Sequence, residues 1–353
     1  MKSPSLSVII VTYKRPLELS NALTSVIEQT VLPQEIIVVD NGDDRATRDL
    51  IEKRKQEFAR KGIGLRYVKN DRDDSLCVAR NMGVELSKGM FVSFVDDDIV
   101  LGKDYHERIF EVFEKKPHAL VVQGYNQTTK EAYLNQGKRK KRPGVKEMIM
   151  GTLVHFYNGV FQASCSLEKE RCRVLPSLSA TYPSPDINKI ISCEWIVNAA
   201  AVYKRSVLEE FTFDERLKRF AWGIDQDHPY RIFKKYPKAL FLTPFAHWWD
   251  KSSPRGRLPR KELIYMMEVY ELYVFYKIID QTLKNKIIYF WRKSGNLFIH
   301  RILFNVLTLG RGNPKIGFLK MKYATGAFFY ALRHRKELKQ GDLDFFNKTL
   351  SGE

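Results

Sequence analysis

Three consecutive aspartates, Asp96, Asp97 and Asp98, follow the apolar residues 91–95. Such an apolar run predicts a strand buried on both faces, and open α/β sheets bind ligands outside the carboxyl ends of their strands. Adjacent carboxylates repel one another unless a cation lies among them, and Mg²⁺ or Mn²⁺ prefers oxygen ligands of this kind. A solvated acidic turn is the alternative. The position at a strand end favours a metal that bridges the protein to substrate phosphates.

The residues before these aspartates predict the elements that position them. Strand patterns alternate with helical patterns, the strands at residues 6–11, 36–39 and 65–68 and the helices at residues 19–27, 46–60 and 79–86. A fourth strand follows at residues 91–95. This alternation of strands and helices predicts a parallel sheet with right-handed crossovers. No G-x-G-x-x-G follows the first strand and no G-x-x-x-x-G-K-[ST] occurs. A nicotinamide or flavin domain and a P-loop are therefore disfavoured.

Five segments resemble the motifs of family 2 glycosyltransferases, in the order that the family has them. They are LSVIIVTYKRP at residues 6–16, IIVVDNG at 36–42, ARNMG at 79–83, FVDDD at 94–98 and WGIDQDHPYR at 222–231. The resemblance covers roughly residues 5–250. It implies a GT-A fold, an α/β and Rossmann-like architecture with a mostly parallel sheet flanked by helices. It also implies sugar transfer from a nucleotide-sugar with inversion at the anomeric carbon.

The resemblance also implies roles for the acidic residues. Asp98 is the direct metal ligand, Asp96 helps to hold the ribose or the metal's waters, and Asp97 is assigned to the nucleotide-sugar. Asp225 falls on the family's base position, with Asp227 as a possible second acid. Capping of a helix N-terminus is the alternative for both. This chain departs from the family in having Ile224 where Glu usually precedes the base.

Candidate nucleotide-sugar contacts lie in the predicted loops. Thr12, Tyr13 and Arg15 follow the first strand, and Asp40 ends the second, where each can meet a base or ribose. Arg80 lies near the start of a helix and can contact a diphosphate as a charged fork. A surface ion pair is the alternative for Arg80.

Three later side chains complete the predicted site. Trp195 and Trp222 can stack on sugar faces at the acceptor site, with burial in the core as the alternative. His247 follows a strand pattern at residues 239–243. A histidine near this point is often a further metal ligand in related enzymes, and a structural role is the alternative.

Composition places the chain in a broad class. Its 353 residues carry a net charge of +18 and four cysteines, Cys77, Cys165, Cys172 and Cys193. The cysteines fit no common zinc spacing and are interpreted as reduced thiols. No signal peptide is seen at the N-terminus, which predicts a cytoplasmic protein. The basic residues 137–143 are interpreted as a solvated loop, with a mobile lid or a contact to anionic lipid or diphosphate as alternatives.

The C-terminal residues 251–353 hold 20 Lys and Arg against 8 Asp and Glu, a net charge of +12, together with many aromatics. This pattern is typical of helices that lie in a membrane interface. The apolar residues 302–310 are too few to span a bilayer, which needs about 20. Binding to a membrane is favoured over binding to nucleic acid as the role of these residues. A packed helical tail is a third alternative.

The sequence therefore predicts a metal-dependent inverting glycosyltransferase, peripheral on the cytosolic face of a membrane. The donor is expected to be a UDP-, GDP- or dTDP-sugar, and the acceptor a lipid-linked glycan or a polysaccharide. Residues 1–100 and 101–250 are expected to form the donor and acceptor halves of the catalytic domain, and residues 251–353 a membrane-proximal tail. A regulatory protein that binds nucleotide-sugars without turnover is the alternative. A nucleotidyltransferase is disfavoured because its Gly-rich basic loop is missing.

Overall fold

The computed structural model describes residues 5–73, 75–131, 152, 160, 166–168, 170–253, 258–295, 297 and 314–351. The chain divides into two compact units. The first contains Met1–Asn135, Glu168–Cys172 and Pro183–Arg257, and the second contains Gln136–Leu167, Arg173–Tyr182 and Leu258–Glu353. The basic residues 137–143, Cys165 and the apolar residues 302–310 lie outside the described residues.

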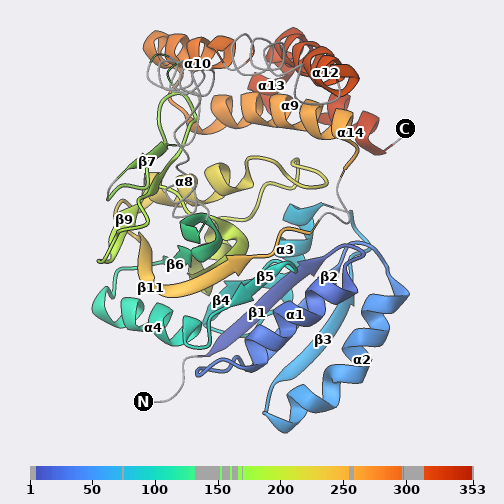
Figure 1. The fold of residues 1–353 in the computed structure, drawn as a ribbon, viewed down its shortest axis with the longest axis vertical. Coiled ribbons are helices and arrows are strands. Elements are labelled where there is room, and N and C mark those ends of the chain that lie inside the picture. Colours follow the sequence, from blue (N-terminus) through green and yellow to red (C-terminus); the bar gives the residue numbers. More distant parts are fainter. Residues whose placement is uncertain are drawn as a thin grey trace. The chain divides into compact units, whose positions relative to one another are not determined.

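The N-terminal strands of the first unit form the predicted parallel sheet (Figure 1). The strands are β1 (Leu6–Thr12), β2 (Glu35–Asp40), β3 (Gly64–Lys69) and β4 (Phe91–Phe94), connected by α1 (Pro16–Ile27), α2 (Arg45–Arg60) and α3 (Leu76–Leu86). They lie in the order β3-β2-β1-β4, and every pairing among them is parallel. The carboxyl ends of β1, β2 and β4 therefore meet at one edge, as the alternating pattern predicts.

Beyond β4 the sheet becomes mixed. It continues through β10 (Ala201–Lys204), β6 (Val121–Asn126), β11 (Leu240–Asp250) and β5 (Ile99–Leu101), and β9 (Ile191–Cys193) also pairs with β11. Only β6 and β11 pair in parallel in this part, and the other pairings are antiparallel. The strand predicted at residues 239–243 runs on to Asp250, past a register shift between Thr243 and His247.

Apolar residues fill both faces of the sheet. Side chains of α1, α2 and α4 (Tyr105–Lys115) pack with alternate residues of β1 and β2, such as Val8 and Val38, in the larger core cluster. α3 packs on the other face, where Ala79 and Met82 meet Ile37 and Val39. Alternation of this kind follows from the two-residue period of a strand.

Three short elements complete the first unit, the 3₁₀ turn η1 (Asn198–Ala200), α7 (Arg205–Glu210) and α8 (Ile224–Lys235). The strands β7 (Ser166–Glu168) and β8 (Thr181–Pro183) form a separate two-stranded sheet, most of which belongs to the second unit. The helix α8 begins after Gly223, whose φ of 91° suits glycine.

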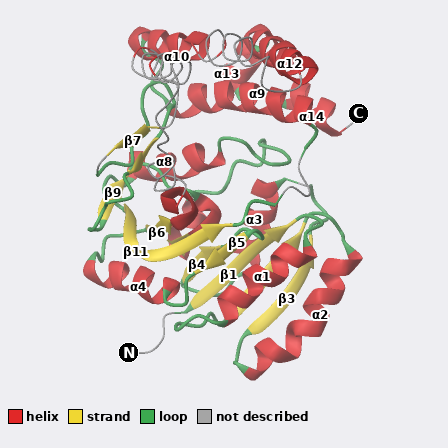
Figure 2. Ribbon diagram, in the orientation of Figure 1, coloured by secondary structure: helices red, strands yellow, loops and turns green. Residues whose placement is uncertain are grey.

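The second unit is helical in its C-terminal part (Figure 2). Its helices are α9 (Arg260–Ile278), α10 (Leu283–Gly295), α12 (Pro314–Arg333), α13 (Arg335–Gln340) and α14 (Asp344–Ser351). A small core joins Ile264 of α9 to Ala324 and Ala327 of α12. Among the described residues, no helix has the length and apolar character that crossing a bilayer requires.

Candidate active site

Asp97 ties the acidic turn after β4 to the end of β1. It is only 4% exposed, and it accepts hydrogen bonds from Thr12 Oγ1 at 2.8 Å and Arg15 Nη1 at 3.0 Å. Burial raises the pKa of Asp97 to about 6, against the opposing effect of Arg15. The structure thus brings Thr12, Arg15 and Asp97 together, with both oxygens of Asp97 already in use.

The two outer aspartates keep accessible oxygens. Asp98 Oδ2 accepts from Arg15 Nη1 and from Ser253 N, both at 3.3 Å, while Asp96 Oδ1 accepts from Arg80 Nη2 at 2.7 Å. In the described part of the chain, Asp98 Oδ1 and Asp96 Oδ2 have no hydrogen-bond partner. Burial raises the pKa of Asp98, and the charge of Asp96 raises it further. Two neighbouring carboxylates with open oxygens suit a divalent cation.

His247 does not join these aspartates. Its Nε2 lies 2.9 Å from the carbonyl oxygen of Pro244, and no group of three or more His, Cys, Asp or Glu side chains among the described residues is arranged to hold a metal ion. A Mg²⁺-type ion is commonly held by only one or two carboxylates plus substrate phosphates. Asp96 and Asp98 fit that pattern without His247.

Arg80 is buried rather than a surface residue. Its side chain is 2% exposed, and its guanidinium lies 5.4 Å from the ring centroid of Phe94 and 5.5 Å from that of Phe213. Nη1 is buried without a hydrogen-bond partner among the described residues. Burial opposes the charge of Arg80, but Asp96 and then Asp225 raise its pKa above the ordinary value. The surface ion pair expected as the alternative is therefore wrong, and Arg80 links Asp96 electrostatically to Asp225.

Asp225, in the first turn of α8, is held through one oxygen only. Its Oδ1 accepts from Asn198 N and Asn198 Nδ2, each at 2.9 Å. The hydroxyl of the buried Tyr203 donates to Asn198 Oδ1, which orients the amide so that Nδ2 faces Asp225. Oδ2 of Asp225 has no partner among the described residues. Burial raises the pKa of Asp225, while Asn198 and Arg80 lower it.

Asp227 has a different environment from Asp225. It is 1% exposed, and its Oδ2 receives Arg231 Nη2 at 3.1 Å, one helical turn away. Neither aspartate caps α8, because Gly223 occupies the N-cap position without a side-chain cap. Ile224 is 7% exposed, so the position that carries Glu in the resemblance is here an apolar packing position.

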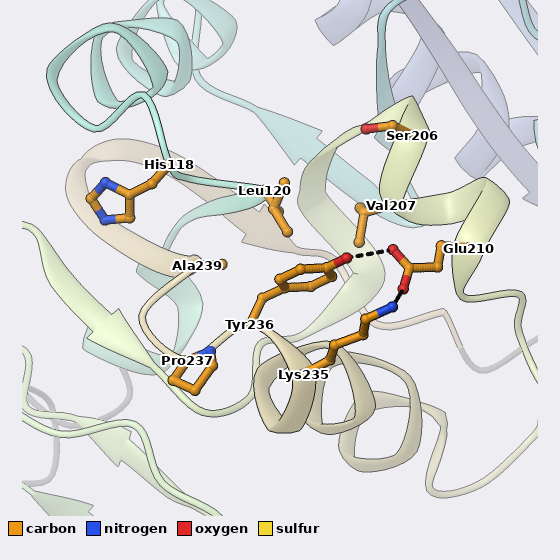
Figure 3. A pocket seen from close by; sticks show the side chains of 9 residues that line it. All are labelled: His118, Leu120, Ser206, Val207, Glu210, Lys235, Tyr236, Pro237 and Ala239. Atoms are coloured by element: carbon orange, nitrogen blue, oxygen red, sulfur yellow. Dashed lines mark hydrogen bonds and ion pairs between the residues drawn. The ribbon is translucent and has the colours of Figure 1, made fainter.

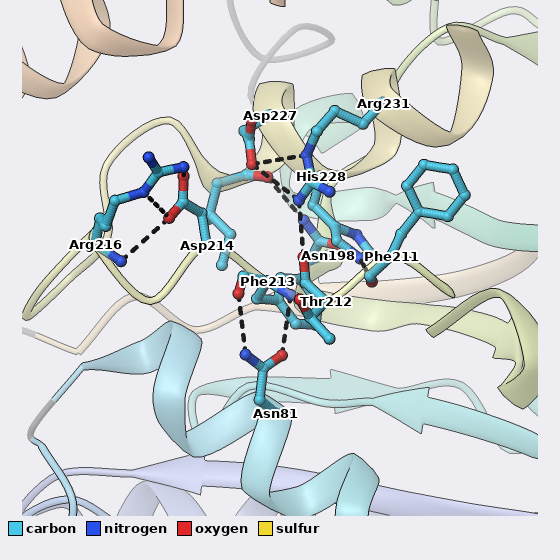
Figure 4. Close-up of polar contacts among 11 residues, drawn as sticks. Asn81, Asn198, Phe211, Thr212, Phe213, Asp214, Arg216, Asp227, His228 and Arg231 are labelled. Atoms are coloured by element: carbon cyan, nitrogen blue, oxygen red, sulfur yellow. Dashed lines mark hydrogen bonds and ion pairs between the residues drawn. The ribbon is translucent and has the colours of Figure 1, made fainter. Parts of the chain in front are cut away.

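The loop before α8 is fastened to both neighbouring helices (Figure 4). Asn81 of α3 donates to Phe213 O and accepts from Phe213 N, both at 2.9 Å. From α8, Arg231 Nη2 donates to Thr212 O at 2.8 Å, and His228 Nε2 lies 2.7 Å from Phe211 O. These contacts hold the Phe213 ring against Arg80.

The remaining predicted residues lie in mixed environments. Asp40 is fully buried and shapes its own turn by accepting from Gly42 N, Asp44 N and the Tyr67 hydroxyl. Tyr13 is half-buried beside Lys14, whose Nζ lies 5.3 Å from its ring.

The two candidate tryptophans also differ. Trp195 is 6% exposed, which agrees with the core alternative, whereas Trp222 is half-buried with Phe220 beside it, the ring centroids 6.4 Å apart. Of the two, only Trp222 keeps a substantially exposed ring.

Sequence reasoning missed three residues of the site, Asn198, Tyr203 and Ser253. Asn198 and Tyr203 act on Asp225 from η1 and β10, and Ser253 donates its backbone N–H to Asp98 from 155 residues away. Asn198 lies three residues after Trp195, which the sequence indicated as a candidate at the acceptor site. A backbone donor such as Ser253 N leaves no sequence signal at all.

A pocket of about 550 Å³ lies away from these residues, at the amino ends of β6 and β11 (Figure 3). It is lined in part by His118, Lys235 and Tyr236, and both Lys235 and Tyr236 contact Glu210. None of the predicted site residues lines it. The acidic turn after β4, beside the carboxyl end of β1, therefore remains the candidate active site.

Comparison with known proteins identifies related sequences. A family model described as Glycosyl transferase family 2 matches residues 7–166. An uncharacterized glycosyltransferase of Methanocaldococcus jannaschii is 30% identical over 254 residues, covering 71% of this chain and 82% of the relative. The validoxylamine A glucosyltransferase of Streptomyces hygroscopicus subsp. limoneus is 29% identical over 124 residues, 34% of this chain. The alignment with this chain covers only 26% to 36% of the length of this glucosyltransferase and of two further curated relatives.

Solved structures share the fold. The mannosyltransferase PcManGT of Pyrobaculum calidifontis, in complex with GDP-Man and Mn²⁺, superimposes with a TM-score of 0.53 at 15% identity, covering 94% of this chain and 88% of that chain. TarS of S. aureus in complex with UDP-GlcNAc gives 0.52 at 16% identity, covering 95% of this chain and 88% of that chain. At these identities the likeness establishes the GT-A fold alone.

Proposed function

The chain belongs to glycosyl transferase family 2, and we propose that it transfers a sugar with inversion from a nucleotide-sugar to an acceptor hydroxyl. One observation carries the proposal. Arg80 is buried, donates to Asp96 and interacts electrostatically with Asp225, so a donor-side carboxylate and a base candidate share one guanidinium. Inversion requires the nucleophile and the leaving group on opposite faces of the sugar, and this arrangement supplies a group for each.

Asp225 is the proposed general base. Its free Oδ2 accepts the proton of the acceptor hydroxyl, while Asn198 fixes Oδ1. A carboxylate whose pKa is raised by burial is a stronger base than an exposed one, and general-base catalysis contributes roughly 10²- to 10⁴-fold. Asp227 is the weaker candidate, because it is buried and paired with Arg231.

Asp98 and Asp96 are the proposed holders of Mg²⁺ or Mn²⁺, through the oxygens that have no partner among the described residues. Such an ion would stabilise the charge that develops on the leaving diphosphate. Arg15 orients Asp98 and Asp97, and the unpartnered Nη1 of Arg80 offers a further donor to an anionic oxygen. The PcManGT complex contains Mn²⁺, which supports the use of a divalent ion.

The proposed donor is a UDP-, GDP- or dTDP-sugar. Solved relatives of the same fold are described in complex with GDP-Man and with UDP-GlcNAc. Thr12, Tyr13, Arg15 and Asp40 lie at the loops after β1 and β2, where the nucleotide is expected. The proposed acceptor is a lipid-linked glycan or a polysaccharide at the cytosolic face of a membrane, since residues 251–353 carry a net charge of +12.

The proposal is tested in two steps. Thermal stabilisation by each nucleotide-sugar, with and without Mn²⁺, identifies the donor, and release of the free nucleotide then measures turnover. Asp225→Asn should retain donor binding but release nucleotide roughly 10²-fold more slowly or worse, whereas the exposed Asp49→Asn on α2 should match the wild type. Undiminished turnover by Asp225→Asn would refute the assigned base, and no stabilisation by any nucleotide-sugar would refute the donor class.

A further inference from the structure

Helix α10 exposes three of its large apolar side chains and buries two of its four charged ones. Leu283, Ile287 and Trp291 are 75%, 60% and 53% exposed, and their spacing of four residues places them along one face. Trp291 Nε1 donates to Val160 O at 3.1 Å. We call these three residues the apolar stripe. By contrast, Arg292 and Lys293 are only 7% and 5% exposed.

The buried cations are paired with α9. Arg292 pairs with Glu271, and Lys293 Nζ lies 2.5 Å from Glu268 Oε2 and 3.1 Å from Glu271 Oε2. Tyr289, also on the inner face, stacks on Phe275 with ring centroids 3.9 Å apart. Specific contacts with α9 therefore fix the orientation of α10.

This arrangement is the reverse of an amphipathic helix facing water, which buries its apolar stripe and exposes its charges. Desolvating ions and hydrating large apolar groups are both unfavourable. The exposure of the apolar stripe becomes favourable when the outer face of α10 meets an apolar phase, while the ion pairs to α9 stay as they are.

Charge complementarity points to the nature of that phase. On the helix, Lys284 and Lys286 fall on opposite sides of the apolar stripe, and α10 carries no acidic residue. Lysines beside Leu, Ile and Trp are the composition that binds at the headgroup level of anionic bilayers. A second protein copy fits less well. Three side chains, at about 150–250 Å² for even a large aromatic, fall short of the about 800 Å² that each partner buries in a stable interface.

We propose that α10 is the membrane-docking element, with the apolar stripe inserted among the acyl chains of an anionic lipid surface and Lys284 and Lys286 at the headgroups. This inference rests on the membrane location proposed above and adds the surface that mediates it. Docking lies in the plane of the interface, since α10 has 13 residues and a spanning helix needs about 20.

The test is co-sedimentation of the full-length protein with phosphatidylcholine vesicles, with or without anionic phosphatidylglycerol. The wild type should bind the anionic vesicles and dissociate as salt rises. Leu283→Gln/Ile287→Gln should bind at least about tenfold more weakly, with unchanged circular dichroism because both side chains are exposed. Met90→Gln, on an equally exposed apolar residue of the first unit (70%), is the matched control. Lys284→Gln/Lys286→Gln should also weaken binding to the anionic vesicles. Lys53→Gln/Lys55→Gln, which removes two lysines of α2, is the control and should bind them like the wild type.

The outcomes separate the inference from its premise. If the wild type binds neither kind of vesicle, both the proposed membrane location and the proposed docking through α10 are wrong. If the wild type binds and Leu283→Gln/Ile287→Gln binds equally well, only the assignment to α10 is wrong. A concentration-dependent dimer that the same substitutions abolish would identify a second copy as the occupant and overturn the proposal. Trp291 emission, taken as the difference from Trp291→Phe, should shift to the blue with anionic vesicles; an unchanged spectrum would also overturn it.

Discussion

At the residue scale, the site depends on carboxylates whose two oxygens have different tasks. Asp98 and Asp225 each use one oxygen for contacts within the protein and leave the other without a partner among the described residues. The contacts fix the direction in which the second oxygen points. A carboxylate held in this way is oriented before any substrate arrives, which lowers the entropic cost of reaction.

Asp98→Ala should abolish metal-dependent donor binding and lower transfer by at least about 10²-fold, because the leaving diphosphate loses its bridge to the protein. Calorimetric titration of Mn²⁺ with the identified donor measures the binding, and EDTA should reproduce the loss in the wild type. Asp43→Ala, at an exposed ion-paired aspartate beyond β2, is the control. Full activity in EDTA would contradict metal dependence.

Asn198→Ala should move the acidic limb of the kcat/KM profile to higher pH. Burial raises the pKa of Asp225 and Asn198 lowers it, so losing the amide donor raises the pH at which the base ionises. The rate above that limb should fall by about tenfold, the equivalent of one hydrogen bond of about 1.4 kcal/mol.

Tyr203→Phe should shift the same limb in the same direction but less, since it only frees the Asn198 amide to turn. Tyr270→Phe is the matched control, because Tyr270 donates to Asn347 Oδ1 at 2.7 Å in the second unit. Profiles identical to the wild type in both Asn198→Ala and Tyr203→Phe would show that the pair does not position Asp225.

At the element scale, the close approach of α3 to β1 sets the position of Arg80. A Cβ added to Gly83 would lie 2.5 Å from Ile9 Cγ2, whereas a Cβ added to Gly64 of β3 would meet nothing closer than 3.7 Å. Gly83→Ala should therefore lower the free energy of unfolding by about 1–3 kcal/mol through overpacking, and Gly64→Ala should not. Urea denaturation of both variants checks this. Equal stability of the two would indicate that α3 moves away from β1 at little cost.

The same elements show what the sequence could predict. The strands β1, β2 and β4, which end at Thr12, Asp40 and Phe94, follow from largely apolar runs, because a strand buried on both faces shows no alternation of polar and apolar residues. The antiparallel strands β5, β9 and β10 have three or four residues each, too few for periodicity to distinguish them from loops. Of the mixed part of the sheet, the sequence therefore predicted the start of β11 but not β5, β9 or β10.

Without the resemblance, the acidic part of the site was predictable where its residues follow those apolar runs, as Asp96 and Asp98 do. Asp225 was assigned through the resemblance instead. The partners of Asp225 were not, because Asn198 and Tyr203 come from η1 and β10, whose place beside β4 is set by tertiary pairing. The metal role of His247 followed from the resemblance and stays a prediction; in the structure its Nε2 lies 2.9 Å from Pro244 O.

At the scale of the whole molecule, every proposed catalytic residue belongs to the first unit, which ends at Arg257. A chain truncated after Arg257 should keep donor-induced thermal stabilisation with Mn²⁺, since Ser253, the last contributor to the site, is retained. It should lose vesicle binding with α10. Circular dichroism must show that the truncated chain folds, because residues 136–167 and 173–182 belong to the second unit. Loss of donor binding in a folded truncation would contradict the assignment of the site to the first unit.

The backbone hydrogen bond from Asp96 N to Ala199 O, 3.0 Å long, connects the two halves of the proposed site. Ala199 contacts the acidic turn, and its covalent neighbour Asn198 contacts Asp225. Consecutive Cα atoms are about 3.8 Å apart, so a single peptide link joins the backbone that contacts Asp96 to the residue that holds Asp225. A misplacement of about 1 Å can cost about 10²-fold in rate, and a peptide link does not stretch. Under the proposed mechanism, a displacement of this turn would therefore move the contacts of Asp96 and Asp225 together rather than one against the other.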